Sequence, residues 1–191
     1  MKLRLHVTMK YCHRCGTELH HKGLHHVYEC AQGHIIYANA SPAVGAILLN
    51  DKNEVLIMAR GQAPGIGALT IPGGFCNGAE SIEDGLFREI YEETRITRKQ
   101  YGELTFITSG IDHYDADHQV APVSAVMFMA RLHGQVTPVL DIENQWYTFV
   151  PLKQIDPEAF YSITVRAAFR ALLTHKPPKQ HPALLPPFKE L

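Results

Sequence analysis

Residues 74–96 read Gly-Phe-Cys-Asn-Gly-Ala-Glu-Ser-Ile-Glu-Asp-Gly-Leu-Phe-Arg-Glu-Ile-Tyr-Glu-Glu-Thr-Arg-Ile, a glycine loop followed by a segment of helical character. If the helix begins near Ser81, then Glu89, Glu92 and Glu93 stand at positions i, i+3 and i+4, and their carboxylates lie on one face within a turn. Three like charges repel one another unless a cation neutralises them, and carboxylate oxygens are the ligands that Mg²⁺ and Mn²⁺ prefer. The stretch therefore predicts a divalent-metal site on a helix, although a solvated acidic face has the same composition.

The residues around the glutamates favour the metal site over a solvated face. Ser81 with Asp84 three residues later resembles a capping box, which fixes the start of the helix directly after the loop. Ile82, Leu86 and Ile90 are spaced four apart and form an apolar stripe that anchors the helix to a core. The acidic face is thereby held in one place.

The loop before the helix is suited to approach the same ion. Pro72-Gly73-Gly74 can bring backbone carbonyls close to a metal because glycine has no side chain to obstruct it. Gly73 is therefore a candidate metal ligand. Glu80 and Arg88 bracket the loop, and we expect them to pair across it.

These residues together resemble the Nudix box, in which Gly is followed by five residues, Glu, seven residues, Arg-Glu, an apolar residue, any residue, Glu-Glu, any residue, Gly and an apolar residue. The matching positions are Gly74, Glu80, Arg88, Glu89, Ile90, Glu92, Glu93 and Ile96. Arg95 stands where the family has glycine. That position falls at the helix C-terminus, where a left-handed residue is often required, and a non-glycine residue there costs about 1 kcal/mol.

The resemblance implies an enzyme that hydrolyses a nucleoside diphosphate linked to another moiety, with one to three Mg²⁺ (or Mn²⁺) ions held by Glu89, Glu92 and Glu93. Cations screen the anionic diphosphate and align the attacking water. In this family the general base comes from the box or from a later loop. We place Glu92 or Glu93 first and Glu143 second, since Glu143 lies in the acidic stretch just before an apolar run.

The chain around the box predicts a mixed α/β (α+β) sandwich, the fold of this family. Apolar runs at 42–49 and 55–60, separated by a polar turn, indicate a hairpin. Further strands are expected at 104–109, 123–132 and 146–150, and a second helix at 157–174. The resemblance covers about residues 40–175. The expected organisation is an N-terminal extension (1–10), a zinc ribbon (11–38), the Nudix domain (39–176) and a Pro-rich tail (177–191).

The zinc ribbon is predicted from Tyr11-Cys12-His13-Arg14-Cys15-Gly16, which has the Cys-x2-Cys-Gly form of a zinc knuckle. Cys30 supplies a third thiolate. Zinc-ribbon relatives usually have a second Cys-x2-Cys here, and Gly33 occupies the place of the fourth ligand. His34, one residue on, is the first candidate for that ligand, with His25, His26 and His13 as rivals. The predicted cofactor is a structural Zn²⁺.

Composition sets broader limits. Eighteen basic and nineteen acidic side chains give a formal charge of −1, which offers no basic surface for long nucleic acid. The N-terminus is too polar for a secretory signal, and no apolar run is long enough for a membrane span. Four cysteines, three of them in metal-like spacing, indicate no disulfide framework. We expect a cytoplasmic protein, and the resemblance implies a homodimer.

Substrate choice depends on weaker signals. The NADH group of relatives has a proline-rich signature shortly after the box that this chain lacks, and a polar loop is expected at 110–118 instead. The acids and histidines of that loop could contact substrate or a further metal, or the loop could be a solvated hairpin turn. Residues 159–163 resemble a short stretch of the FAD and ADP-ribose group. We therefore favour ADP-ribose, FAD or a related dinucleotide, with an NADH or NAD-cap pyrophosphatase and a non-catalytic nucleotide-sensing protein as alternatives. Candidate substrate-binding residues are Arg60, Phe75 and Tyr114, and Trp146 offers a further stacking surface.

Overall fold

A computed structural model describes residues 9–23, 26–116 and 119–174 of the chain. The predicted tail, most of the N-terminal extension, His25, Asp117 and His118 lie outside the described residues. The strands are β1 (Leu19–His21), β2 (Val27–Cys30), β3 (Ile35–Tyr37), β4 (Ser41–Leu49), β5 (Glu54–Arg60), β6 (Leu69–Thr70), β7 (Thr105–Ala116), β8 (Gln119–Arg131) and β9 (Asn144–Pro151). The α-helices are α1 (Ile82–Thr94) and α2 (Ile163–Leu173), and short 3₁₀ helices occupy Arg98–Gln100, Leu152–Gln154 and Pro157–Ala159.

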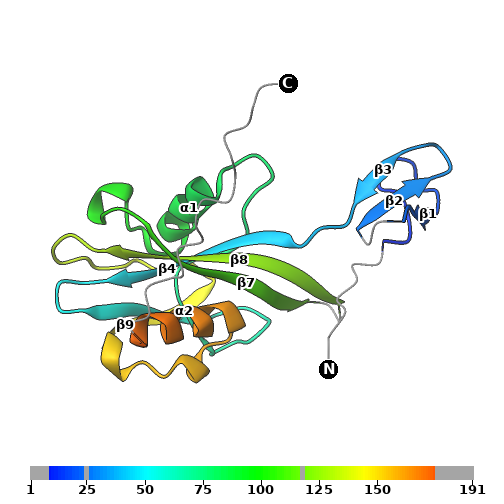
Figure 1. Ribbon diagram of the computed structural model, residues 1–191. Helices are drawn as coiled ribbons and strands as arrows, with labels where there is room; N and C mark the ends of the chain where they lie inside the picture. The colour runs from blue at the N-terminus through cyan, green and yellow to red at the C-terminus, as the bar shows by residue number, and fades with distance from the viewer. Residues whose placement is uncertain (1–8, 24–25, 117–118, 175–191) are drawn as a thin grey trace, which may run out of the picture.

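The larger sheet is mixed, as predicted. Its strand order is β6-β5-β4-β8-β7, with β9 paired to β5, and only the β4–β8 pair among these is parallel. Helix α1 covers one face of this sheet and α2 covers the other (Figure 1). The small antiparallel sheet β1-β2-β3 forms a separate N-terminal module at one end of the molecule (Figure 1).

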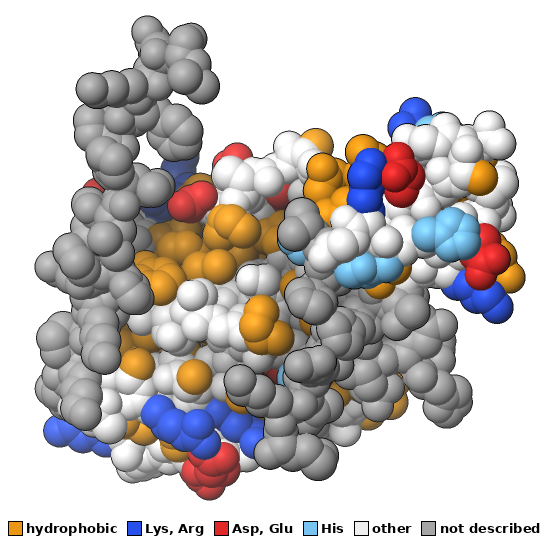
Figure 2. Space-filling model, turned by 45° about the vertical axis from the view of Figure 1, so that its right-hand side comes forward, with side chains coloured by type: hydrophobic (Ala, Val, Ile, Leu, Met, Phe, Trp, Pro, Cys, Tyr) orange, Lys and Arg blue, Asp and Glu red, His pale blue; other side chains and the backbone are white. Residues whose placement is uncertain are grey.

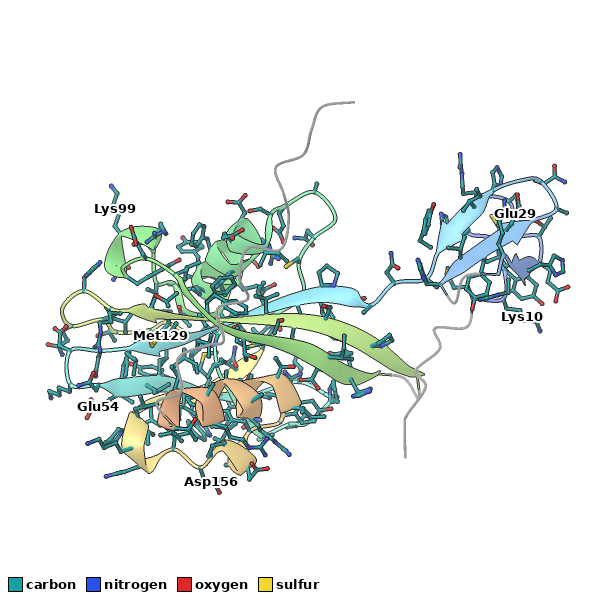
Figure 3. The ribbon with its side chains drawn as sticks, in the orientation of Figure 1. Lys10, Glu29, Glu54, Lys99, Met129 and Asp156 are labelled. Carbon is teal, nitrogen blue, oxygen red and sulfur yellow. The ribbon has the colours of Figure 1, made fainter. Side chains whose placement is uncertain are left out.

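Strand β4 is the centre of the sandwich because it is buried on both faces. Val44, Ala46 and Leu48 pack into the cluster that contains Leu86 and Ile90 of α1. The alternate residues of β4 point the other way, toward Val165, Ala168 and Phe169 of α2. Side chains in a strand alternate between faces, so a strand without polar side chains from Pro42 to Leu49 fits this central place. Side chains fill both layers between helix and sheet (Figure 3), and the apolar stripe predicted for α1 is confirmed.

The glycine loop is inserted into the sheet beside β4. Strands β4 and β5 form the predicted hairpin, yet their ladder pairs only Leu49 with Val55. Farther along β4, the amides of Ala46 and Val44 donate to the carbonyls of Pro72 and Gly74, each at 2.9 Å. The loop therefore pairs with the part of β4 that β5 leaves unpaired. This brings the loop next to α1.

Two of the predicted elements have different bounds. Residues 110–116, expected in a loop, belong to β7, which pairs with β8 along its whole length. This strand was not recognised in the sequence because the segment is polar and lacks a clear apolar alternation. The helix expected at 157–174 is divided: a 3₁₀ turn ends at Ala159, and Ser162 starts α2 by accepting a hydrogen bond from the Val165 amide.

Helix α1 begins and ends as the sequence indicates. Ser81 is the N-cap, and its hydroxyl accepts from the Asp84 amide at 3.0 Å. At the other end Arg95 is left-handed, with φ 58° and ψ 13°, and its amide donates to the Tyr91 carbonyl at 2.8 Å. Its guanidinium lies 5.5 Å from the centroid of the Tyr91 ring. The chain thus adopts at Arg95 a backbone conformation that favours glycine.

We expect Arg95→Gly to stabilise the protein because it removes the steric cost of a Cβ in the left-handed conformation. The free energy of unfolding, measured by urea denaturation, should exceed that of Arg95→Ala by about 1 kcal/mol. Arg95→Ala is the matched control, since it loses the same contact with Tyr91 and keeps the strain. Equal stability of the two variants would show that this residue is not strained.

Candidate functional site

Arg88 connects the acidic residues of the site. Its guanidinium contacts both carboxylate oxygens of Glu80, at 2.7 and 3.1 Å, which confirms the predicted pair across the loop. The same group donates to Glu89 at 2.7 Å, to Glu92 at 2.9 Å and to the carbonyl of Phe75 at 2.9 Å. The arginine hydrogen bonds lower the pKa of Glu80 to about 2. The Arg88 guanidinium therefore holds the loop and two of the three helix glutamates together.

Glu93 is the buried member of the acidic group. One of its oxygens accepts from the Gly73 amide at 2.7 Å, and the other accepts from the side-chain amide of Asn144 at 3.1 Å. Burial raises the pKa of Glu93 to about 8, and the two hydrogen bonds oppose that rise. The carboxylate is fixed between the glycine loop and the first residue of β9.

Four carboxylates line one cavity of about 370 Å³, namely those of Glu89, Glu92, Glu93 and Glu143. The first three come from α1, as predicted, and Glu143 comes from the segment that leads into β9. That segment is held in place because the Glu143 carbonyl accepts from the Gly61 amide at 2.6 Å and the Glu143 amide donates to Asp141. The structure thus brings the predicted acidic residues of two distant segments to the same cavity.

Gly73 and Gly74 allow the loop to come this close. Gly73 has φ 149°, and a Cβ there would lie 2.2 Å from the Val44 carbonyl oxygen. A Cβ on Gly74 would lie 2.8 Å from the carboxyl group of Glu89. Any larger residue at either position would displace the loop or the carboxylate, so both glycines are needed for the geometry.

The donor set of this cavity suits a hard divalent cation. All four side chains offer carboxylate oxygens, which Mg²⁺ and Mn²⁺ prefer, and the Gly73 backbone lines the same space. Burial also raises the pKa of Glu89, with the neighbouring glutamates adding to the rise. A bound cation would offset the free-energy cost of ionising these carboxyl groups, because coordination favours the ionised form of each ligand.

The predicted substrate-binding residues surround the same cavity, with one exception. Arg60, Phe75 and Tyr114 all line it, and the rings of Phe75 and Tyr114 meet edge to face with centroids 5.2 Å apart. Trp146 is not among the described residues that line the cavity. Its side chain is partly exposed elsewhere on β9.

Asn144 was missed by the sequence reasoning, and Asp112 was expected only among the acids and histidines of a polar loop that could contact substrate or a further metal. Asn144 holds Glu93, and Asp112, buried on β7, faces the N-terminus of α2. Their partners are 51 and 52 residues away in the chain, so no local spacing pattern relates them. For Asn144 the one available signal is its place beside Glu143 at the start of an apolar run.

The N-terminal module gathers the predicted zinc ligands. Cys12, Cys15, Cys30 and His34 present ligand atoms that all lie within 4.8 Å of one another. The Cys15 and Cys30 sulfurs are 3.6 Å apart, and the Cys12 sulfur is 3.6 Å from Nδ1 of His34. Tetrahedral zinc with its usual bond lengths requires sulfur–sulfur and sulfur–nitrogen separations of about 3.8 and 3.6 Å. The four residues therefore fit a zinc ion.

Other histidines of this module lie outside the ligand cluster. Figure 2 shows histidine side chains gathered on the module's surface, and Figure 3 places Lys10 and Glu29 there too, far from Met129 in the main sheet. Among the described residues, the rivals His13 and His26 do not join the cluster, and the ring of His26 instead lies 6.3 Å from that of Tyr37.

The fold is a mixed sheet covered by a helix on each face, and the glycine loop and the glutamates of α1 lie together at one cavity. This is the arrangement that the Nudix box resemblance implies. A family model described as NUDIX domain matches residues 40–171. The chain therefore belongs to this family, as the resemblance implied.

Two curated relatives and one solved structure illustrate the likeness. The chain is 36% identical over 101 residues to an ADP-ribose pyrophosphatase of Methanocaldococcus jannaschii, a match that covers 53% of this chain and 57% of that protein. It is 26% identical over 190 residues to the mitochondrial NAD(P)H pyrophosphatase NUDT13 of Mus musculus, covering 97% of this chain and 48% of that protein. The chain thus spans about half the length of each. A NUDIX hydrolase from Nitrosomonas europaea shares the fold, with a TM-score of 0.64, 22% identity, and coverage of 88% and 92% of the two chains.

The Glu80–Arg88 pair predicts a pH dependence of stability. The pKa of Glu80 falls from about 4.5 to about 2 on folding, so the pair stabilises fully above about pH 4.5 and its contribution is lost as pH falls through 2. Urea midpoints should show Glu80→Gln less stable than the wild type at pH 7, by a gap that is constant to about pH 5 and narrows below pH 4.5. Glu83→Gln is the matched control, since Glu83 is exposed on the same helix and is not a partner of Arg88. A gap that persists unchanged at pH 3 would contradict this assignment.

Proposed function

We propose that this protein hydrolyses the diphosphate linkage of a nucleoside diphosphate joined to another moiety, with Mg²⁺ or Mn²⁺ bound in the acidic cavity. The observation that carries the proposal is the convergence of Glu89, Glu92, Glu93 and Glu143 on one space of about 370 Å³. In the reaction, water attacks one phosphorus and the bond from that phosphorus to the bridging oxygen breaks. The products are two phosphate monoesters, which for ADP-ribose are AMP and ribose 5-phosphate.

The helix glutamates and the Gly73 carbonyl are the proposed ligands. When bound, the divalent ion screens the phosphate oxygens and lowers the pKa of a coordinated water. Glu93 is oriented by Gly73 and Asn144, and Glu89 and Glu92 by Arg88. Their geometry is therefore set before substrate arrives, as metal ligands require.

The contacts favour Glu143 as the general base over Glu92 and Glu93. Both oxygens of Glu93 already accept hydrogen bonds, and Glu92 is paired with Arg88. Within the described residues, the carboxylate of Glu143 has no hydrogen bond or ion pair, and Glu143 lines the cavity from the segment that precedes β9. We therefore propose that Glu143 accepts the proton of the attacking water while the helix glutamates hold the ion.

Substitution of Glu92 and Glu143 separates these two roles. Glu92→Gln should raise the Mg²⁺ concentration needed for activity and lower turnover at least about 100-fold, since loss of a ligand exceeds the usual effect of its supporting residues. Glu143→Gln should lower kcat by a comparable factor while Mn²⁺ still binds, as measured by electron paramagnetic resonance. Glu83→Gln, on the exposed side of α1, is the matched control. Full activity of Glu92→Gln would defeat the site assignment.

Three functions remain candidates for this site. They are hydrolysis of ADP-ribose, FAD or a related dinucleotide, hydrolysis of NADH or an NAD cap, and nucleotide sensing without catalysis. The relatives named above carry the descriptions ADP-ribose and NAD(P)H pyrophosphatase, and these support a dinucleotide or sugar nucleotide substrate for this chain. A panel of ADP-ribose, FAD, NADH and nucleoside triphosphates with Mg²⁺ decides among them. Tight binding of one compound without turnover of any would favour a nucleotide-sensing protein.

We also propose that the N-terminal module, residues 11–38, is a structural zinc ribbon preceding a catalytic domain over residues 39–176. Its core is small, consisting of Cys12, Leu19, Tyr28, Cys30 and Ile36 with two partly buried neighbours. So small a core supplies little stability, and a bound metal compensates for this in small modules. Hydrogen bonds from Thr17 lower the pKa of the Cys15 thiol to about 6, which favours the thiolate that zinc binds.

Metal analysis of the purified protein should find about one equivalent of zinc. His34→Ala should lose zinc and lower the unfolding temperature of the module, because one ligand of four is removed. His26→Ala is the matched control and should keep its zinc, as His26 is a nearby histidine outside the cluster. Less than half an equivalent in the wild type would contradict a zinc ribbon.

A further inference from the structure

The segment that carries Glu143, residues 139–144, is held by two separate elements. On one side it contacts the last turn of α1. The Val139 amide donates to the Thr94 carbonyl at 2.8 Å, and the Asp141 amide donates to the preceding carbonyl of the helix at 3.4 Å. The carbonyls of the last helical turn have no partner within the helix, so they are available for such contacts. The segment is thereby attached to the helix that supplies the other three carboxylates of the acidic cavity.

On the other side, the segment pairs with the chain at the end of β5. The Gly61 amide donates to the Glu143 carbonyl at 2.6 Å. Just before this contact the β5–β9 ladder shifts by one residue, because Gln145 of β9 is skipped in the pairing. A bulge of this kind changes the register beyond it, and without the shift Gly61 would lie opposite Asn144. The bulge therefore brings the backbone of Glu143 against Gly61.

A side chain at Gly61 would strike the backbone of this segment. A Cβ there would lie 3.0 Å from the Glu143 carbonyl oxygen and 3.1 Å from the Ile142 carbonyl oxygen. Carbon and carbonyl oxygen atoms in contact are usually about 3.3 Å or more apart, so the segment would have to move by about 0.3 Å. The backbone at Gly61 is not left-handed. The close approach, rather than the backbone conformation, is therefore what requires glycine here.

The place of the Glu143 carboxylate depends on how its backbone is held. Within the part of the chain that the structure describes, this carboxylate has no hydrogen bond or ion pair, whereas each carboxylate of α1 that lines the cavity is held by another residue. A general base must lie within hydrogen-bond reach of the water from which it takes a proton. Because the carboxylate lacks a contact of its own, a shift of the backbone at residue 143 is passed on to it.

We propose that Gly61 is a positioning residue for the general base, and that its lack of a side chain sets the place of Glu143 relative to the ions held by α1. The inference rests on the proposed function, in which Glu143 accepts the proton of the attacking water. Gly61 does not itself line the acidic cavity. A Cβ at this position moves the base away from the water, while the metal ligands on α1 keep their own contacts. The expected result is a lower kcat with unchanged binding of the ions.

Gly61→Ala tests this role against Gly78→Ala as the matched control. A Cβ on Gly78 meets no atom within 4 Å, and neither glycine is left-handed. We expect Gly61→Ala in the full-length protein to lower kcat at least about 4-fold, since a misplacement of about 1 Å costs about 100-fold and the expected shift is about 0.3 Å. The assay uses saturating Mg²⁺ and the panel compound that the wild type cleaves fastest. The KM and the Mn²⁺ affinity, measured by electron paramagnetic resonance, should stay within about 2-fold, as should every parameter of Gly78→Ala.

A double variant shows whether Gly61 acts through Glu143. In protein that already carries Glu143→Gln, Gly61→Ala should lower kcat no further, because the base whose place it sets is gone. An equal loss in both backgrounds would overturn the inference, since a purely structural role acts in both.

Three further outcomes are decisive. An unchanged kcat in Gly61→Ala would also overturn the inference, as would a Gly61→Ala protein that does not fold, because a local shift of about 0.3 Å should leave the domain intact. Unfolding temperatures are measured alongside for this reason. Full activity of Glu143→Gln would instead refute Glu143 as the base, and a wild type that cleaves none of the panel would refute the proposed function.

Discussion

The site depends on the guanidinium of Arg88, which contacts Glu80, Glu89, Glu92 and the Phe75 carbonyl at once. Without it, carboxylates on neighbouring turns would repel one another, and the loop would lose the ion pair between Glu80 and the helix. A planar guanidinium can serve several acceptors in fixed directions, which the point charge of lysine cannot do. The acidic cluster is therefore held together by the protein's own contacts.

The same cluster explains how the sheet is built. Glu93 accepts from the amide of Gly73, and the loop that contains Gly73 is inserted along β4 in place of a strand. A side chain at Gly73 would collide with the β4 backbone, so the insertion requires a glycine. On the opposite side, Asn144 connects Glu93 to β9. The loop, the helix and the sheet thus all contact the carboxylate of Glu93. Its burial is tolerated because both of its oxygens accept hydrogen bonds.

Local patterns in the sequence were sufficient to predict the features whose residues lie close together in the chain. The glutamate face of α1, its Ser81 cap and the cysteines of the ribbon all follow from short spacings. The length of β7 did not follow, because its polar residues hid the strand and its pairing with β8 is a property of the whole sheet. Asn144 was missed, and the contacts of Asp112 with α2 were not foreseen, for a related reason: each acts on a partner about fifty residues away. Arg95 was recognised as a departure from the box, and only the structure shows that the backbone remains left-handed there.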